Sequence, residues 1–69
     1  MIEATNRLRE ILAEKHISHT QLAKQIGVSQ STVSKWCTNT SQPVLSNLLK
    51  LTRTLGVGIE AIVLMQEEV

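Results

Sequence analysis

The stretch that most constrains the fold is residues 18–36, with the sequence SHTQLAKQIGVSQSTVSKW. Ser18 can cap the start of a helix, and Gln21, three residues later, completes the S-x-x-Q pattern of a capping box. Gly27 follows the last apolar position of that helix and can adopt the left-handed conformation that closes it. Ser29 can then cap a second helix. The stretch therefore predicts two short helices joined by a tight turn.

Each of these two helices has one apolar stripe. Leu22, Ala23 and Ile26 recur at helical spacing on the first, and Val33 and Trp36 do so on the second. The stripes can pack against each other, which predicts a helix-turn-helix motif over about residues 18–37. The outer side of the second helix carries hydrogen-bonding side chains and no acid, namely Gln30, Ser31, Ser34 and Lys35. Such a face can read DNA bases, and ordinary polar helix surface is the alternative.

The length and composition indicate one small helical domain over residues 1–69. Apolar residues make up 42% of the chain and charged residues 19%, and the three glycines lie near predicted helix ends. These values predict a compact all-α domain with a modest core. No run approaches 18 apolar residues, and the N-terminus lacks an apolar secretory core. We therefore expect a cytoplasmic protein with no membrane contact.

The net charge is only +1, so the distribution of charge along the chain is the better indication of a polyanionic partner. Residues 15–59 contain five cations and no Asp or Glu: Lys15, Lys24, Lys35, Lys50 and Arg53. The acids lie on either side of this stretch: Glu3, Glu10 and Glu14 before it, and Glu60, Glu67 and Glu68 after it. This pattern predicts that one face meets phosphates, with Lys24 among the residues that contact a DNA backbone, although a short chain can show such a pattern by chance.

The sequence offers no set of residues for catalysis or metal binding. It has no Asp, and no catalytic set of nucleophile, base and orienting acid is visible in it. No pocket for a small-molecule substrate is indicated either. Cys37 cannot form an internal disulfide and makes a poor metal set with His16 and His19. We therefore expect neither an enzyme nor a cofactor.

The segments before and after the motif are also predicted. Residues 1–16 are expected to form the first helix. The loop at residues 38–43, TNTSQP, consists of turn formers, and Asn39 can adopt the left-handed conformation. Backbone N–H groups of this loop and the hydroxyls of Thr38, Thr40 and Ser41 can contact a phosphate, with a plain connector as the alternative.

Two further helices are predicted after the loop. Pro43 suits the first turn of a helix that ends at Gly56, and its five leucines are expected in the core. A last helix is expected to begin at about Ile59. Its apolar run surrounds more of the helix than a small core can cover, so we expect residues 57–69 to form a dimer through Ile62, Leu64 and Met65. A short strand paired across a dimer is the alternative.

Beyond the motif, the chain resembles the Xre-type, or phage Cro and repressor-like, helix-turn-helix family from residue 8 to residue 63. The residues that carry the resemblance are QLAKQIGVSQSTVSKW, a turn, a Pro, LLKLTRTLGV and a final short helix. The resemblance implies a five-helix repressor-like domain that regulates transcription by repression. It also implies a homodimer that binds a pseudo-palindromic operator in double-stranded DNA, in a bacterial or phage-type cytoplasm at the nucleoid.

The resemblance also implies roles for single residues. His19 and Thr20 would lie near a phosphate, Gln30 and Ser31 at the start of the recognition helix, and Ser34 and Lys35 further along it. Gln30 is the strongest candidate, because an amide can bond adenine N6 and N7 together. The serine hydroxyls discriminate more weakly, and Lys35 can reach guanine or a phosphate.

The sequence departs from the family pattern at three places. Leu12 and Cys37 stand where family members often have Arg and Glu, and losing both charges together suggests an apolar contact. Asn39 stands where Gly is frequent, and Asn tolerates that turn. Val44 stands where a capping Ser is frequent, and Val cannot cap, so the fourth helix is expected to begin less firmly.

A second function remains open from the sequence. The low net charge and the apolar run at residues 62–65 also suit a protein-interaction module, such as an antitoxin or anti-regulator, in which DNA binding is secondary.

Overall fold

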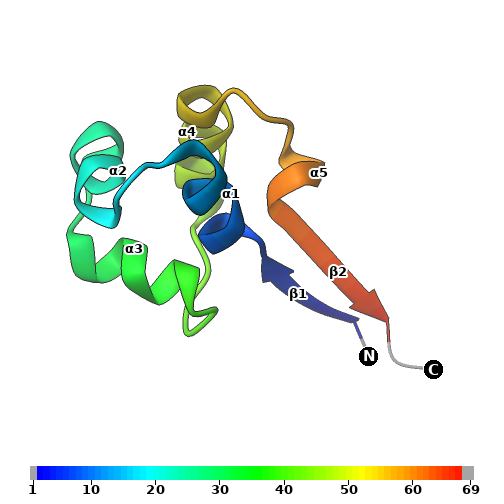
Figure 1. The fold of residues 1–69 in the computed structure, drawn as a ribbon. Helices are drawn as coiled ribbons and strands as arrows, with labels where there is room; N and C mark the ends of the chain where they lie inside the picture. Colours follow the sequence, from blue (N-terminus) through cyan, green and yellow to red (C-terminus); the bar gives the residue numbers. More distant parts are fainter. Residues whose placement is uncertain (1, 68–69) are drawn as a thin grey trace.

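The computed structural model describes the backbone of residues 2–67 and the side chains of residues 4–64. In chain order its elements are β1 (Ile2–Asn6), α1 (Leu8–Lys15), α2 (His19–Ile26), α3 (Gln30–Cys37), α4 (Leu45–Leu55), α5 (Ile59–Ile62) and β2 (Val63–Glu67). The helices form one body, and the two strands project from it side by side as a ribbon (Figure 1). The five predicted helices are confirmed, and a two-stranded sheet is added to them.

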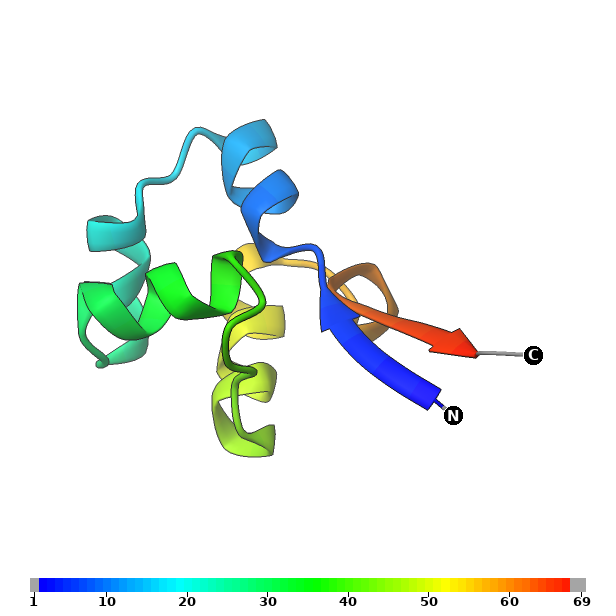
Figure 2. The same ribbon diagram turned by 90° about the horizontal axis from the view of Figure 1, so that it is seen from below.

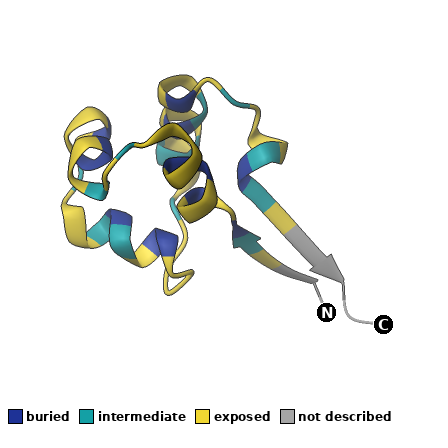
Figure 3. Cartoon of the chain, viewed as in Figure 1, coloured by how far each residue is buried: buried dark blue, intermediate teal, exposed yellow. Residues whose placement is uncertain are grey.

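The core lies where the helices meet, and every helix contributes to it (Figure 3). One side chain from each helix is fully buried: Leu8, Leu22, Val33, Leu51 and Ile62. Trp36 is only 3% exposed, so the prediction that the single aromatic residue packs in the core is confirmed. The cluster therefore holds all five helices around one small centre.

The caps predicted for the motif are present. Ser18 Oγ accepts a hydrogen bond from the Gln21 N–H at 3.1 Å, and Gln21 Oε1 accepts one from the Ser18 N–H at 2.9 Å. Gly27 ends α2 with a left-handed φ of 88°. The first turn of α3 is capped by Ser29, whose Oγ accepts from the Thr32 N–H at 3.1 Å. These local contacts fix where α2 ends and α3 begins.

The predictions for α4 were partly wrong. The helix begins at Leu45, so Pro43 lies before it rather than in its first turn, and Val44 occupies the N-cap position without a side-chain hydrogen bond. Only Leu51 and Leu55 are buried, whereas Leu45 and Leu49 are 69% and 50% exposed. An 11-residue helix has one buried stripe, and these two leucines face away from it.

Both ends of the chain differ from the prediction. Residues 2–6 form β1 instead of the first turns of a helix, and the last helix stops at Ile62, after which β2 begins. The two strands are antiparallel, with Thr5 opposite Leu64 and Asn6 opposite Val63. The alternative of a strand at the C-terminal end is therefore correct in its conformation, but its partner in the structure is β1 of the same chain. The pairing joins residues some 60 positions apart, which local patterns do not reveal.

Candidate nucleic-acid interface

α3 carries three of the four predicted base-contacting residues on its exposed side. Gln30, Ser31 and Lys35 are exposed, whereas Val33 and Trp36 on the opposite side are buried. The Ser29 cap is reinforced by a contact of 2.8 Å between its Oγ and Thr32 Oγ1. The structure therefore presents an amide, a hydroxyl and an ammonium group from one firmly started helix.

Ser34, the fourth predicted base contact, lies half-buried and faces α2. Its Oγ is 3.0 Å from Nδ1 of His19, the first residue of α2. The same hydrogen bond engages His19, which was predicted to contact a phosphate, and it ties the start of α2 to the middle of α3. Both residues thus have a positioning role within the motif that the sequence pattern did not indicate.

The remaining predicted backbone contacts on α2 are exposed. Thr20 and Lys24 are four residues apart, so they lie on the same side of the helix. α2 packs against α3 and ends at the turn that leads into it (Figure 2). With no acid between residues 15 and 59, Lys24 and Lys35 give this part of the surface a positive charge.

The loop after α3 exposes hydroxyl groups, but the backbone N–H groups of residues 38–41 already form hydrogen bonds within the chain. Thr40 and Ser41 donate their N–H groups to the Lys35 carbonyl at 2.9 and 3.3 Å, and Thr38 and Asn39 donate theirs to Ser34 and Trp36. Phosphate contacts through the N–H groups of residues 38–41 are therefore excluded, because these groups close the end of α3. The hydroxyls of Thr38 and Thr40 are 2.8 Å apart, and the side chains of Thr38, Thr40 and Ser41 are exposed. Asn39 has the predicted left-handed φ, 58°.

Comparison with known proteins places this geometry in a family. The sequence profile described as Helix-turn-helix matches residues 8–62, which include all five helices. The chain belongs to the Xre-type helix-turn-helix family.

Relatives of this helix-turn-helix protein agree with the assignment. A protein of Haemophilus influenzae, described as an "Uncharacterized HTH-type transcriptional regulator", is 35% identical over 51 residues. That match covers 74% of this chain and 21% of the relative, so the chain spans about a fifth of the relative's length. A crystal structure described as "a putative DNA-binding protein from Bacteroides fragilis" is 39% identical. It superposes with a TM-score of 0.86 and covers 90% of this chain and 100% of that one.

The two family positions that lack their usual charges are both buried in this helix-turn-helix protein. Leu12 is 2% exposed and Cys37 is 5% exposed, on helices α1 and α3, which pack together. Burial raises the pKa of the Cys37 thiol, and the nearby positive charge of Arg9 lowers it by a smaller amount. Cys37 is therefore a neutral thiol at pH 7 and packs as a small apolar residue.

Sequence reasoning missed Asn6 and Gln42, which join the ribbon to the loop after α3. Asn6 Nδ2 donates to the Trp36 carbonyl at 2.9 Å and to Gln42 Oε1 at 2.7 Å. Asn6 Oδ1 accepts from the Leu8 N–H at 2.9 Å, so the side chain also serves the start of α1. Asn is frequent at helix starts, and Asn6, two residues before the first helical residue Leu8, could have indicated this second role. Nothing local indicates the contacts with Trp36 and Gln42.

The residues predicted for a dimer interface lie in different environments. Ile62 is fully buried within the chain, so its side chain cannot meet a second subunit, and this part of the prediction was wrong. Leu64 is 40% exposed. The side chain of Met65 lies outside the described residues.

Two general features of the described residues bear on other kinds of function. The part of the chain that the structure describes contains no group of three or more His, Cys, Asp or Glu placed to hold a metal ion. Within that same part, every helix is too short or too polar to cross a lipid bilayer.

Proposed function

We propose that this protein binds double-stranded DNA in a sequence-specific manner, with α3 in the major groove, and represses transcription as a homodimer. The observation that carries the proposal is the arrangement of α3. One side is locked into the core by Val33 and Trp36, while Gln30, Ser31 and Lys35 are exposed from its capped first residue onward. An α-helix with its side chains is about 10–12 Å across, which fits the major groove, about 12 Å wide.

Base reading centres on Gln30. Its amide N–H can donate to adenine N7 while its amide oxygen accepts from the adenine N6 amino group. No other side chain on the exposed side of α3 can make this pair of hydrogen bonds. Ser31 adds a hydroxyl that can bond several base edges, and Lys35 reaches guanine or a phosphate. Ser34 contributes mainly by holding His19, because its hydroxyl is already hydrogen-bonded.

Phosphate contacts flank the recognition helix on two sides. Thr20 and Lys24 on α2 contact one stretch of backbone, with His19 at the helix start. The hydroxyls of Thr40 and Ser41 contact another stretch, beyond the end of α3. The Thr38 hydroxyl, which lies 3.2 Å from the Ser34 and Lys35 carbonyls, joins them when it turns away from these carbonyls. Such contacts set the register of the protein on the duplex without reading sequence.

The ribbon is the proposed dimerisation element. A two-stranded sheet is marginal by itself in water, and each strand of the ribbon has one edge without a partner strand among the described residues. Pairing with the ribbon of a second copy stabilises both ribbons and places two α3 helices on one operator. A dimer on a promoter excludes other proteins from that DNA, and its place of action is the bacterial cytoplasm, at the nucleoid.

The proposal is tested by selecting bound sequences from a random duplex pool at fixed, near-physiological salt. We expect a pseudo-palindrome with half-sites about 34 Å apart, centre to centre. Gln30→Ala should cost about 1 to 3 kcal/mol on that site and relax the preference at one position per half-site. Gln25→Ala, which removes an exposed amide of α2, is the matched control and should retain the preference. Equal binding of the parent protein to all sequences contradicts the proposal.

A second function is favoured by the apolar surface of α4. Val44, Leu45 and Leu49 are 63%, 69% and 50% exposed and come from adjacent turns. A patch of this kind suits a protein partner, as in an antitoxin or anti-regulator. Capture of one specific partner that is lost on Leu45→Lys, together with no enriched DNA sequence, would replace the first proposal by this one.

A further inference from the structure

Asn6 is the one buried polar residue among the described side chains, at 7% exposure. It lies at the base of the ribbon, where β1 ends, and the carbonyl of Ile62 accepts a hydrogen bond from the next residue, Arg7, at 2.7 Å. A buried amide is costly unless its groups are bonded, and here both side-chain polar atoms have partners. The site is thus a completed hydrogen-bond network rather than a chance contact.

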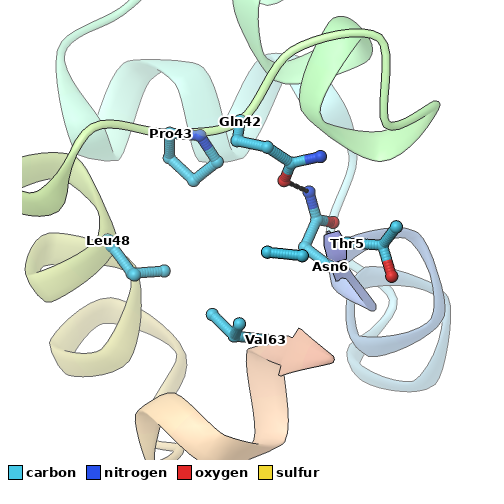
Figure 4. Close-up of a pocket in the computed structure, with 7 residues that line it drawn as sticks. Thr5, Asn6, Gln42, Pro43, Leu48 and Val63 are labelled. Carbon is cyan, nitrogen blue, oxygen red and sulfur yellow. Dashed lines mark hydrogen bonds between the residues drawn. The ribbon is translucent and has the colours of Figure 1, made fainter. Parts of the chain in front are cut away.

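The partners of Asn6 belong to the end of α3 and the loop that follows it. The Asn6 side chain donates to the Trp36 carbonyl and to the Gln42 amide oxygen. The Asn6 backbone N–H donates to Asn39 Oδ1 at 2.8 Å, and the Asn6 carbonyl accepts from Asn39 Nδ2 at 3.2 Å. Gln42 Nε2 donates to the same Asn39 oxygen at 2.9 Å. Figure 4 shows the Asn6 and Gln42 amides facing each other. We call the three side chains of Asn6, Asn39 and Gln42 the amide clasp.

The amide clasp spans the loop that carries the proposed phosphate contacts. Thr40 and Ser41 lie between Asn39 and Gln42, and both of these flanking residues are held by Asn6. On the other side the loop N–H groups bond the Lys35 carbonyl. The hydroxyls of Thr40 and Ser41 are therefore placed relative to α3 by two fixed ends, one of which is the base of the ribbon.

We propose that Asn6 is a positioning residue for DNA binding: through the amide clasp it holds the loop hydroxyls at a phosphate and joins the ribbon to the DNA-contacting surface. This inference rests on the proposed function, because it assigns a cause to the geometry of the loop. Asn6 itself lies behind the loop and does not touch DNA. Ordering the loop before binding avoids an entropic cost in the complex, so loosening the clasp weakens binding without changing which bases are read.

Gln42→Ala is the principal test, because Gln42 is exposed and its loss removes the loop side of the clasp while leaving the core intact. We expect affinity for the selected site to fall about 5-fold, with the base preference at the Gln30 position unchanged. Asn6→Asp keeps the acceptor for the Leu8 N–H and removes the donors to Trp36 and Gln42, and we expect a loss of about 5- to 30-fold. Gln25→Ala, which removes an exposed amide of α2 outside the amide clasp and outside the ribbon, is the control and should bind like the parent.

A DNA readout separates positioning from general destabilisation. Duplexes with a single methylphosphonate at successive positions report the cost of altering each phosphate. The phosphate held by the loop is the one whose penalty disappears in Thr40→Val. We expect the same penalty to shrink in Gln42→Ala and Asn6→Asp, whereas the penalties at phosphates on the α2 side should remain. Each variant is measured at a temperature where circular dichroism shows it folded.

Two outcomes overturn different statements. Parental affinity and unchanged phosphate penalties in folded Gln42→Ala overturn the role of the amide clasp and leave the proposed function standing, whether or not Asn6→Asp folds. Failure of the parent protein to enrich any sequence overturns the proposed function itself.

Discussion

At the scale of single residues, Cys37 gives a pH dependence that can be worked out in sign. Burial raises the pKa of its thiol in the folded protein above that in the unfolded chain. At pH values between these two pKa values, the native state therefore binds more protons than the unfolded state. The contribution of Cys37 to stability is therefore complete below the unfolded pKa and is lost as pH rises through the folded pKa. We expect the urea midpoint to fall between pH 7 and pH 9.5 by more in the parent than in Cys37→Ala. Equal falls in the two proteins would show that Cys37 does not account for the change.

Single residues also show how far local sequence carries a prediction. Ser18, Gln21, Gly27 and Ser29 act on neighbours within three or four positions, so their roles follow from spacing alone, and the structure confirms them. Asn6 acts on residues 30 to 36 positions away. Its role depends on how the helices pack, and so do the hydrogen bond of His19 with Ser34 and the use of the loop N–H groups.

At the scale of elements, α4 lacks a side-chain cap and can be improved. Val44 occupies the N-cap position with φ −66° and ψ 162°, a conformation that a capping Ser also adopts, and its side chain is 63% exposed. Val44→Ser should therefore raise the free energy of unfolding by about 1 kcal/mol, because the hydroxyl can accept an N–H of the first turn. Urea denaturation measures the change. Val44→Ala is the control for the lost methyl groups, and a gain of equal size in that variant would exclude capping as the cause.

The elements differ in how well sequence defined them. α2 and α3 have caps at their starts and one clear apolar stripe each, and their bounds agree with the prediction. The ribbon was missed because residues such as Ile2, Thr5 and Leu64 suit both helix and strand, and only the pairing of the two chain ends decides between them. The leucines of α4 show the same limit, since Leu45 and Leu49 face solvent where one small core is already filled.

At the scale of the whole molecule, the ribbon extends away from a small helical body, and the molecule measures 39 × 22 × 22 Å along its principal axes. α2 and α3 lie at the opposite end from the ribbon tip (Figures 1 and 2). Joining two copies through their ribbons therefore sets the two recognition helices apart. The amide clasp lies between these two ends, so one network joins the proposed dimer element to the proposed DNA contacts.

The proposed dimer predicts how a change in the ribbon alters assembly. Leu64 is 40% exposed and stands opposite Thr5 in the ribbon. Covering this leucine in a dimer removes apolar area from water in both subunits, so Leu64→Lys should raise the dimer dissociation constant about 10-fold or more. Sedimentation equilibrium measures that constant, and binding to a full operator should weaken while binding to one half-site stays the same. Leu45→Lys, which places the same charge on the exposed side of α4, is the matched control and should leave the dimer unchanged. A loss of dimer in Leu45→Lys alone would instead place the subunit contact on α4.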